Sequence, residues 1–162
     1  MDITTENLLI TKLVEYLNNN KAEIGLPVDV FINEHDETGE AMWVQPNSGE
    51  RKTQQYVGGS YRGFFPFTVC YQFTNTNTED GRRAVLDLPF YRLAAYFEAQ
   101  GDRIQLGDAT VTVEMVTHPA ISYVSEDGQT IEHQATFRLG YHHKRPVIPP
   151  KESEGKGDAV PV

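Results

Sequence analysis

The sequence has few of the residues on which several classes of protein depend. It contains a single cysteine, Cys70, which excludes an intramolecular disulfide and a zinc site built from cysteines. No apolar run approaches the roughly 20 residues that a membrane-spanning helix requires. The first six residues are acidic and lack the basic region with which a signal peptide begins. We therefore expect a protein that is made and kept in a reducing cytosol, with no membrane partner.

Basic residues are scarce as well. The chain has 14 Lys and Arg against 23 Asp and Glu, which gives a formal net charge of −9 over 162 residues. Phosphate binding rests on Lys and Arg, so this chain is a poor candidate for wrapping nucleic acid. Residues 145–162 contribute nothing to the net charge, because their three basic and three acidic residues cancel. The acidity therefore belongs to residues 1–144.

The chain does contain enough apolar material for one domain. Its hydrophobic share is 39%, and a chain of this length buries about 70% of its unfolded surface on folding. From Arg145 onward Pro, Lys, Glu and Gly dominate, and that composition cannot build a core. We expect a single domain over residues 1–144, followed by a flexible, disordered tail over residues 145–162.

Two segments have the apolar spacing of amphipathic helices. The first places one stripe at Ile10, Leu13, Val14 and Leu17, and the second at Phe90, Leu93, Ala94 and Phe97. The run Asn18–Asn20 is suited to ending the first helix. Pro89 conflicts with a second helix that runs unbroken from Arg82. We therefore expect a helical turn over residues 81–86, a kink, and a main helix that Gly101 ends.

Strands account for most of the remaining chain. The period-two segments are Val28–Asn33, Ala41–Gln45, Phe64–Phe73, Ala109–Met115, Ile121–Tyr123 and Ile131–Tyr141. Pro66 places the start of the third strand at an edge or a bulge. The polar stretches Pro46–Gln55 and Thr74–Gly81 are predicted to be exposed loops. The order α-β-β-β-α-β-β-β predicts an α+β domain, in which a mainly antiparallel sheet carries both helices on one face.

The sequence offers little catalytic chemistry. It has no phosphate-binding loop, no nucleophile elbow and no zinc-protease motif. His118, His133 and Asp127 can be combined into a site, but nothing in their spacing requires one. Cys70 lies between Val69 and Tyr71 in a predicted strand, and we interpret it as a small buried side chain. We therefore predict no enzyme activity, no catalytic residue, no cofactor and no metal.

An aromatic row leaves one alternative open. Phe65, Phe67, Tyr71 and Phe73 share one face of the third strand. Such a row is typical of a hydrophobic core. It would also suit the pocket of a small α+β ligand-binding domain or enzyme, and this is the alternative to a structural role.

Three segments resemble a known family. They are the helix Leu8–Leu17 with the strand Val28–Asn33, the strand Val69–Phe73 with the helix Arg82–Phe97, and the run Val113–Ala120 with the turn Ser125–Gly128 and a long alternating strand. Together they resemble the minor capsid proteins of tailed phages that infect Gram-positive bacteria, a group related to the tail-terminator proteins. The likeness covers about residues 4–142. Pro89 and the tail after Arg145 depart from the family's pattern.

The resemblance implies a structural role in the virion. Tail terminators form a ring, usually of six subunits, on the head-proximal end of the tail tube. They stop the growth of the tube and present the surface that joins the head connector, and DNA passes through the ring without specific binding. Assembly would take place in the cytoplasm of the host bacterium. A terminator and a neighbouring neck or minor capsid component are both compatible with the resemblance.

Charged and aromatic residues of the polar loops are the candidate interface residues. The basic and aromatic candidates are Arg51, Lys52, Tyr56, Arg82 and Arg83, and the acidic candidates are Glu34, Glu37 and Asp80. We expect the basic groups to pair across subunits with the acidic ones. An exposed ion pair contributes little by itself, so solvated surface charge is the alternative for each residue.

Overall fold

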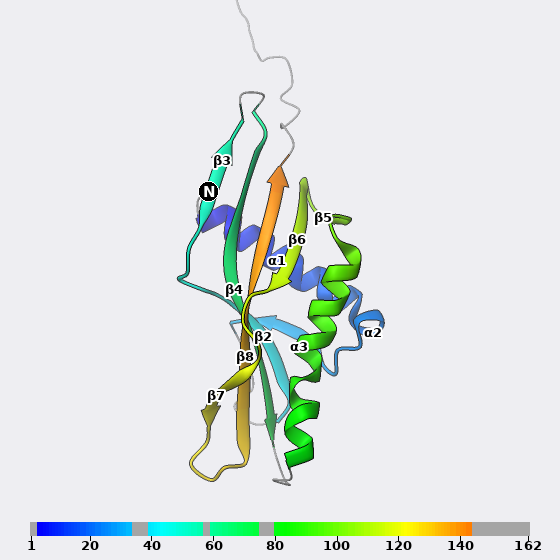
Figure 1. Cartoon of the computed structure of the whole chain (residues 1–162), viewed down its shortest axis with the longest axis vertical. Helices are drawn as coiled ribbons and strands as arrows, with labels where there is room; N and C mark the ends of the chain where they lie inside the picture. The colour runs from blue at the N-terminus through cyan, green and yellow to red at the C-terminus, as the bar shows by residue number, and fades with distance from the viewer. Residues whose placement is uncertain (1–2, 34–38, 57–58, 75–79, 144–162) are drawn as a thin grey trace, which may run out of the picture.

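The fold is an α+β domain whose sheet is mostly antiparallel (Figure 1). The computed structural model describes residues 3–33, 39–56, 59–74 and 80–143. Its elements are α1 (Ile3–Asn19), α2 (Lys21–Ile24), β1 (Val30–Ile32), β2 (Ala41–Pro46), β3 (Lys52–Gln55), β4 (Tyr61–Thr74), α3 (Asp80–Gln100), β5 (Ile104–Leu106), β6 (Ala109–Met115), β7 (Ala120–Val124) and β8 (Thr130–His143). The tail predicted over residues 145–162 lies outside the described residues.

The strands β4 and β8 form the spine of the sheet. Each has 14 residues, and the two are antiparallel partners along their whole length. At about 3.4 Å per residue, this ladder is about 45 Å long. β2 and β3 pair with the outer edge of β4, whereas β6 and β7 pair with the outer edge of β8. β1 adds to β2 in parallel, and β5 adds antiparallel to β6.

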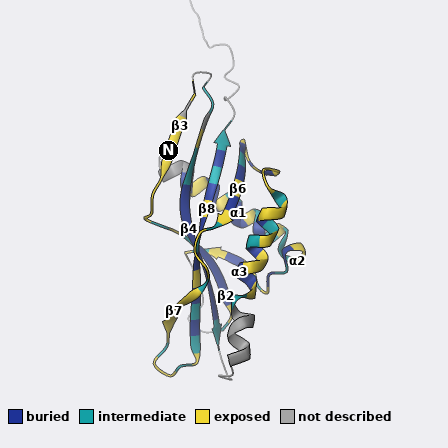
Figure 2. Ribbon diagram, in the orientation of Figure 1, coloured by how far each residue is buried: buried dark blue, intermediate teal, exposed yellow. Residues whose placement is uncertain are grey.

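One hydrophobic cluster joins the helices to the spine. It contains Leu13 of α1 and Phe97 of α3 together with Phe67 of β4 and Phe137 of β8. The rings of Phe67 and Phe137 are stacked with their centroids 5.8 Å apart. Figure 2 shows that buried residues run along the central strands, whereas β7 is exposed. The core therefore lies along the middle of the long ladder and leaves the hairpins at its two ends available to solvent.

The predicted order α-β-β-β-α-β-β-β is wrong, because three elements were missed. α2 and β5 have four and three residues, which is too short for a periodic pattern. β3 lies inside Pro46–Gln55, the stretch predicted to be a loop. Its sequence, Lys-Thr-Gln-Gln, has no apolar alternation because it buries no face, and it is held by backbone pairing with β4.

The predicted division of the second helix into a short turn and a main helix is also wrong. α3 is one helix from Asp80 to Gln100, and Pro89 lies inside it. A proline inside a helix costs about 3 kcal/mol. Phe90, Leu93 and Phe97 are fully buried in the core, and each such side chain returns about 1.5–3 kcal/mol. Core packing therefore outweighs the lost hydrogen bond, while the predicted end of the helix at Gly101 is confirmed by its left-handed φ of 57°.

Pro66 was predicted to lie at an edge or a bulge, and one side of β4 is indeed unpaired at this residue. β3 pairs with Tyr61–Phe64 and β2 pairs with Phe67–Gln72, so no strand partner faces Pro66 on that edge. On the other edge Pro66 lies opposite Arg138 of β8. The missing N–H thus falls in the gap between two short strands that share one long neighbour.

Candidate interaction surfaces

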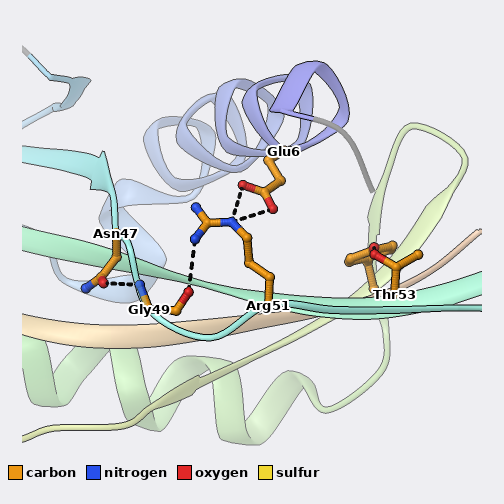
Figure 3. A network of polar contacts seen from close by, with 6 residues as sticks. Glu6, Asn47, Gly49, Arg51 and Thr53 are labelled. Carbon is orange, nitrogen blue, oxygen red and sulfur yellow. Dashed lines mark hydrogen bonds and ion pairs between the residues drawn. The ribbon is translucent and has the colours of Figure 1, made fainter.

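The β3–β4 hairpin is anchored to the body of the domain by an ion pair (Figure 3). The Nε of Arg51 donates to both carboxylate oxygens of Glu6 in α1, at 3.0 and 2.8 Å. A second guanidinium nitrogen donates to the carbonyl of Gly49 at 3.0 Å. The Glu6 side chain is 8% exposed and the Arg51 side chain 37%. Arg51, predicted to pair across subunits, is therefore engaged with a carboxylate of its own chain.

The loop that leads into β3 is also held in place. The side-chain carbonyl of Asn47 accepts the backbone N–H of Gly49 at 2.9 Å, and the Asn47 amide donates to the hydroxyl of Thr68 at 2.9 Å. These bonds tie the loop to the centre of β4. Together with the Arg51–Glu6 pair, they fix the direction in which the hairpin leaves the domain.

The β3–β4 hairpin carries two further predicted interface residues, and both are exposed. Lys52 lies at the root of the hairpin, opposite Phe64 of β4, and Tyr56 lies at its free end. The guanidinium of Arg62 lies 5.4 Å from the centre of the Tyr56 ring, within the range of a cation–π contact. The Tyr56 backbone N–H donates to the carbonyl of Ser60 at 2.8 Å, which closes the end of the hairpin. An aromatic ring and two cationic side chains thus share one projecting surface.

A second hairpin projects at the opposite end of the spine, where β7 meets β8 (Figure 1). The Asp127 carboxylate accepts the Ser125 hydroxyl at 2.6 Å and the Gln129 backbone N–H at 3.0 Å. These two hydrogen bonds, from Ser125 first, lower the pKa of Asp127 below its ordinary value. Gly128 supplies the left-handed φ of 73° that the turn requires. The predicted hairpin turn over residues 125–129 is confirmed.

The strand β7 is exposed throughout and carries large apolar side chains. The exposed fractions are 39% for Ile121, 53% for Tyr123 and 48% for Val124. Within the described residues β7 pairs only with β8, so its other edge has no strand beside it. Natural sheets usually protect such edges with charges, prolines or bulges, and β7 has a bulge between Ile121 and Tyr123. Exposed apolar residues on a sheet edge are typical of an interaction site.

The histidines do not form the site that His118, His133 and Asp127 could have made. His133 is buried and its Nδ1 lies 2.5 Å from the carboxylate of Asp87 in α3. His118 is 3.3 Å from the hydroxyl of Tyr91, on the exposed side of the same helix. Each histidine thus has its own partner. Among the described residues there is no group of three side chains that could hold a metal ion.

The aromatic row of β4 belongs to the hydrophobic core. Phe65, Phe67 and Tyr71 are buried in the main cluster. Cys70 points to the other face and is buried beside Trp43. Burial first, and then the charge of Glu132, raise the pKa of Cys70 to about 12, so the thiol is protonated and unreactive at neutral pH. An open cleft of about 750 Å³ lies elsewhere, between α3 and the end of β6.

Five of the predicted interface residues cannot be placed by their side chains. Glu34 and Glu37 lie outside the described residues. Asp80, Arg82 and Arg83 lie in the first turn of α3, and their side chains are outside the described part. Their predicted pairing across subunits stays a prediction.

Sequence reasoning missed Glu6 and the exposed face of β7. Glu6 is itself the buried member of its ion pair, and its partner Arg51 lies 45 residues away in the sequence. The signal for β7 was present, because its strand has apolar residues at consecutive positions Tyr123 and Val124, which cannot both face the core.

Comparison with known proteins adds no relative. A scan against protein-family models finds no match to the chain, and a search of curated protein sequences finds none either. In the described part of the chain, no helix has the length and apolar character needed to span a bilayer.

Proposed function

We propose that this chain is a structural subunit of a tailed phage. As in the tail terminators that it resembles, its copies would cap the tail tube and form the head–tail joining ring. The observation that carries the proposal is the placement of two projecting hairpins at opposite ends of one long ladder. A ring subunit needs two different surfaces that meet on neighbouring copies and close. It also needs surfaces above and below the ring for the tube and the connector.

We further infer that α1 and α3 pack on one face of the sheet. Their buried residues belong to the same cluster as alternate residues of β4 and β8, which supports this arrangement. It leaves the sheet edges and both hairpins for other proteins. The partners we propose are further copies of the chain, the tail tube protein, and the head-completion or connector protein, all in the virion.

The acidity of the folded part suits such a ring. A net charge of −9 repels the phosphate backbone, so DNA would move through the ring without being held. Binding in this scheme needs no bond chemistry, and the arginine and histidine contacts described above are structural.

The proposal is tested by mixing the purified chain with tubes assembled from its cognate tail tube protein. Electron microscopy should show a ring at one end of the tubes, and the chain should sediment with them. If the chain neither binds tube ends nor sediments with tubes, the proposal is wrong, whatever its oligomeric state in solution.

A further inference from the structure

Charge is segregated between the two hairpins, although the chain as a whole is acidic. Residues 51–78 contain Arg51, Lys52 and Arg62 and no Asp or Glu. Residues 104–137 contain five acidic residues and no Lys or Arg. Three of these acids, Glu126, Asp127 and Glu132, lie on the β7–β8 hairpin. The β3–β4 hairpin itself is therefore basic and the β7–β8 hairpin acidic.

Part of each charge is free to meet a partner. Arg51 is neutralised by Glu6, whereas no carboxylate within the described residues forms an ion pair with Lys52 or Arg62, the other cations of the basic hairpin. On the acidic hairpin, Glu126 and Asp127 are exposed at the turn. Hydrogen bonds from Ser125 and Gln129 lower the pKa of Asp127 below its ordinary value, which is already far below neutral pH.

The strands at these two ends lie at diagonally opposite corners of one sheet. β3 pairs with β4 where β8 residues 140–143 lie opposite, whereas β7 pairs with β8 residues 131–134. Nine residues of β-strand separate the two positions, which is about 30 Å along the sheet. No single copy can therefore bring its own β3 to its own β7.

Strand direction makes the two corners compatible between copies. β3 is antiparallel to β4, β4 to β8, and β8 to β7. A second copy that is shifted along and across the sheet, without being turned over, therefore presents its β3 antiparallel to β7 of the first. Antiparallel pairing is the more stable geometry for such a junction.

We propose that the β3–β4 hairpin of one copy docks on the β7 edge of the next copy, with Lys52 and Arg62 against Glu126 and Asp127. The occupant of the β7 edge is a second copy of this chain, because the complementary charge is found on the chain itself. The Tyr56 ring and the aliphatic stems of the two cations cover the apolar surface of β7. The bulge in β7 shortens the backbone pairing, so charge sets the register.

The contact is heterologous, because it joins different surfaces of two identical copies, and it closes into a ring if the rotation between copies allows. It deepens the proposed function and names the surface through which ring subunits would meet. It also predicts a weak, salt-sensitive association, since exposed charge pairs are screened at high ionic strength.

The test is a charge exchange between two variants. One variant carries Lys52→Glu with Arg62→Glu, and the other carries Glu126→Lys with Gln129→Lys, which leaves the hydrogen bonds of Asp127 in place. In sedimentation at low ionic strength, the wild type should self-associate and each variant alone should lose at least tenfold in association constant. An equimolar mixture of the two variants should associate again, because each now offers the charge that the other lacks.

Matched controls separate this contact from general charge effects. Lys12→Glu with Arg103→Glu lowers the net charge, and Glu15→Lys with Glu23→Lys raises it, and none of these four residues belongs to a hairpin. Both controls should associate as the wild type does. The contact is refuted by a wild type that stays monomeric at high concentration and low salt, by variants that associate unchanged, or by a mixture that stays dissociated.

A cross-linking measurement gives an independent answer. Gln54→Cys protein mixed with Tyr123→Cys protein should form covalent dimers with a short bismaleimide, whereas Gln54→Cys protein alone should not. The buried Cys70 thiol stays unreactive in both. Failure to cross-link in the mixture would overturn the inference. Loss of tube capping with intact charge exchange would instead overturn the proposed function and leave the contact standing.

Discussion

The ion pair between Arg51 and Glu6 gives the sharpest stability prediction, because it joins a nearly buried carboxylate to the root of the basic hairpin. Arg51→Ala removes both hydrogen bonds to Glu6 and the bond to the carbonyl of Gly49. The Glu6 carboxylate would then stay buried, with no positive charge beside it. Such a carboxylate is destabilising, because its desolvation is no longer compensated.

The magnitude follows from the exposure of the two partners. Removing one member of a fully buried pair costs about 3–5 kcal/mol. Arg51 is more than one third exposed, so water reaches the site and screens the charge, and the cost must be reduced accordingly. We expect Arg51→Ala to lower the free energy of unfolding by about 1–3 kcal/mol. This is the range that hydrogen bonds to a charged group contribute to stability.

Urea unfolding followed by circular dichroism measures this loss. Glu6→Gln and the double variant complete a double-mutant cycle, in which the coupling between the two sites should be about 1 kcal/mol or more. Lys21→Ala is a matched control, because it breaks an exposed ion pair in which the Lys21 Nζ lies 2.8 Å from the Asp29 carboxylate. It should lower the free energy of unfolding by less than about 1 kcal/mol. An Arg51→Ala loss below about 0.5 kcal/mol would refute the reasoning.

Three further predictions concern single positions. Gly63→Ala should cost about 1–3 kcal/mol and remove amide-exchange protection from β3, because the added methyl collides with the Lys52 carbonyl and the Tyr141 hydroxyl; unchanged protection would contradict this. Cys70, with its raised pKa and full burial, should resist a thiol reagent at pH 8 until urea unfolds the chain; rapid labelling of the native protein would be the contrary result. Because the pKa of Asp127 is lowered in the fold, its stabilising effect is complete above the unfolded pKa of about 3.9 and is lost as pH falls through the folded value. NMR titration of the Gly128 amide should show this midpoint below pH 3.9, and a midpoint at or above 3.9 would count against the turn geometry.

The parts of the fold that a sequence pattern encodes were predictable. β6 was predicted with its observed bounds, Ala109–Met115, because its alternate residues face the core and the solvent in turn. β3 and β5 were not, since β3 buries no face and β5 has three residues. α3 was divided at Pro89 because local propensity was weighed without the burial of Phe90, which only the tertiary structure supplies.

The candidate surfaces were predictable only in part. The polar hairpin around Lys52 and Tyr56 was singled out from composition, because basic and aromatic side chains stand out on an acidic chain. The partner of Arg51 could not be found in this way, since Glu6 lies far away in the sequence and is brought close by packing of α1. The segregation of charge between the hairpins has meaning only once the ladder places them at opposite ends.

The central claim is that this chain caps a tail tube, and the length of the tubes tests it most directly. Tail tube protein should be polymerised with increasing amounts of the wild-type chain, and tube lengths measured by electron microscopy. A capping subunit predicts tubes that become shorter in proportion to the chain added, with a ring at one end of each tube. Tubes of unchanged length with bare ends, at a molar excess of folded chain, would contradict the account.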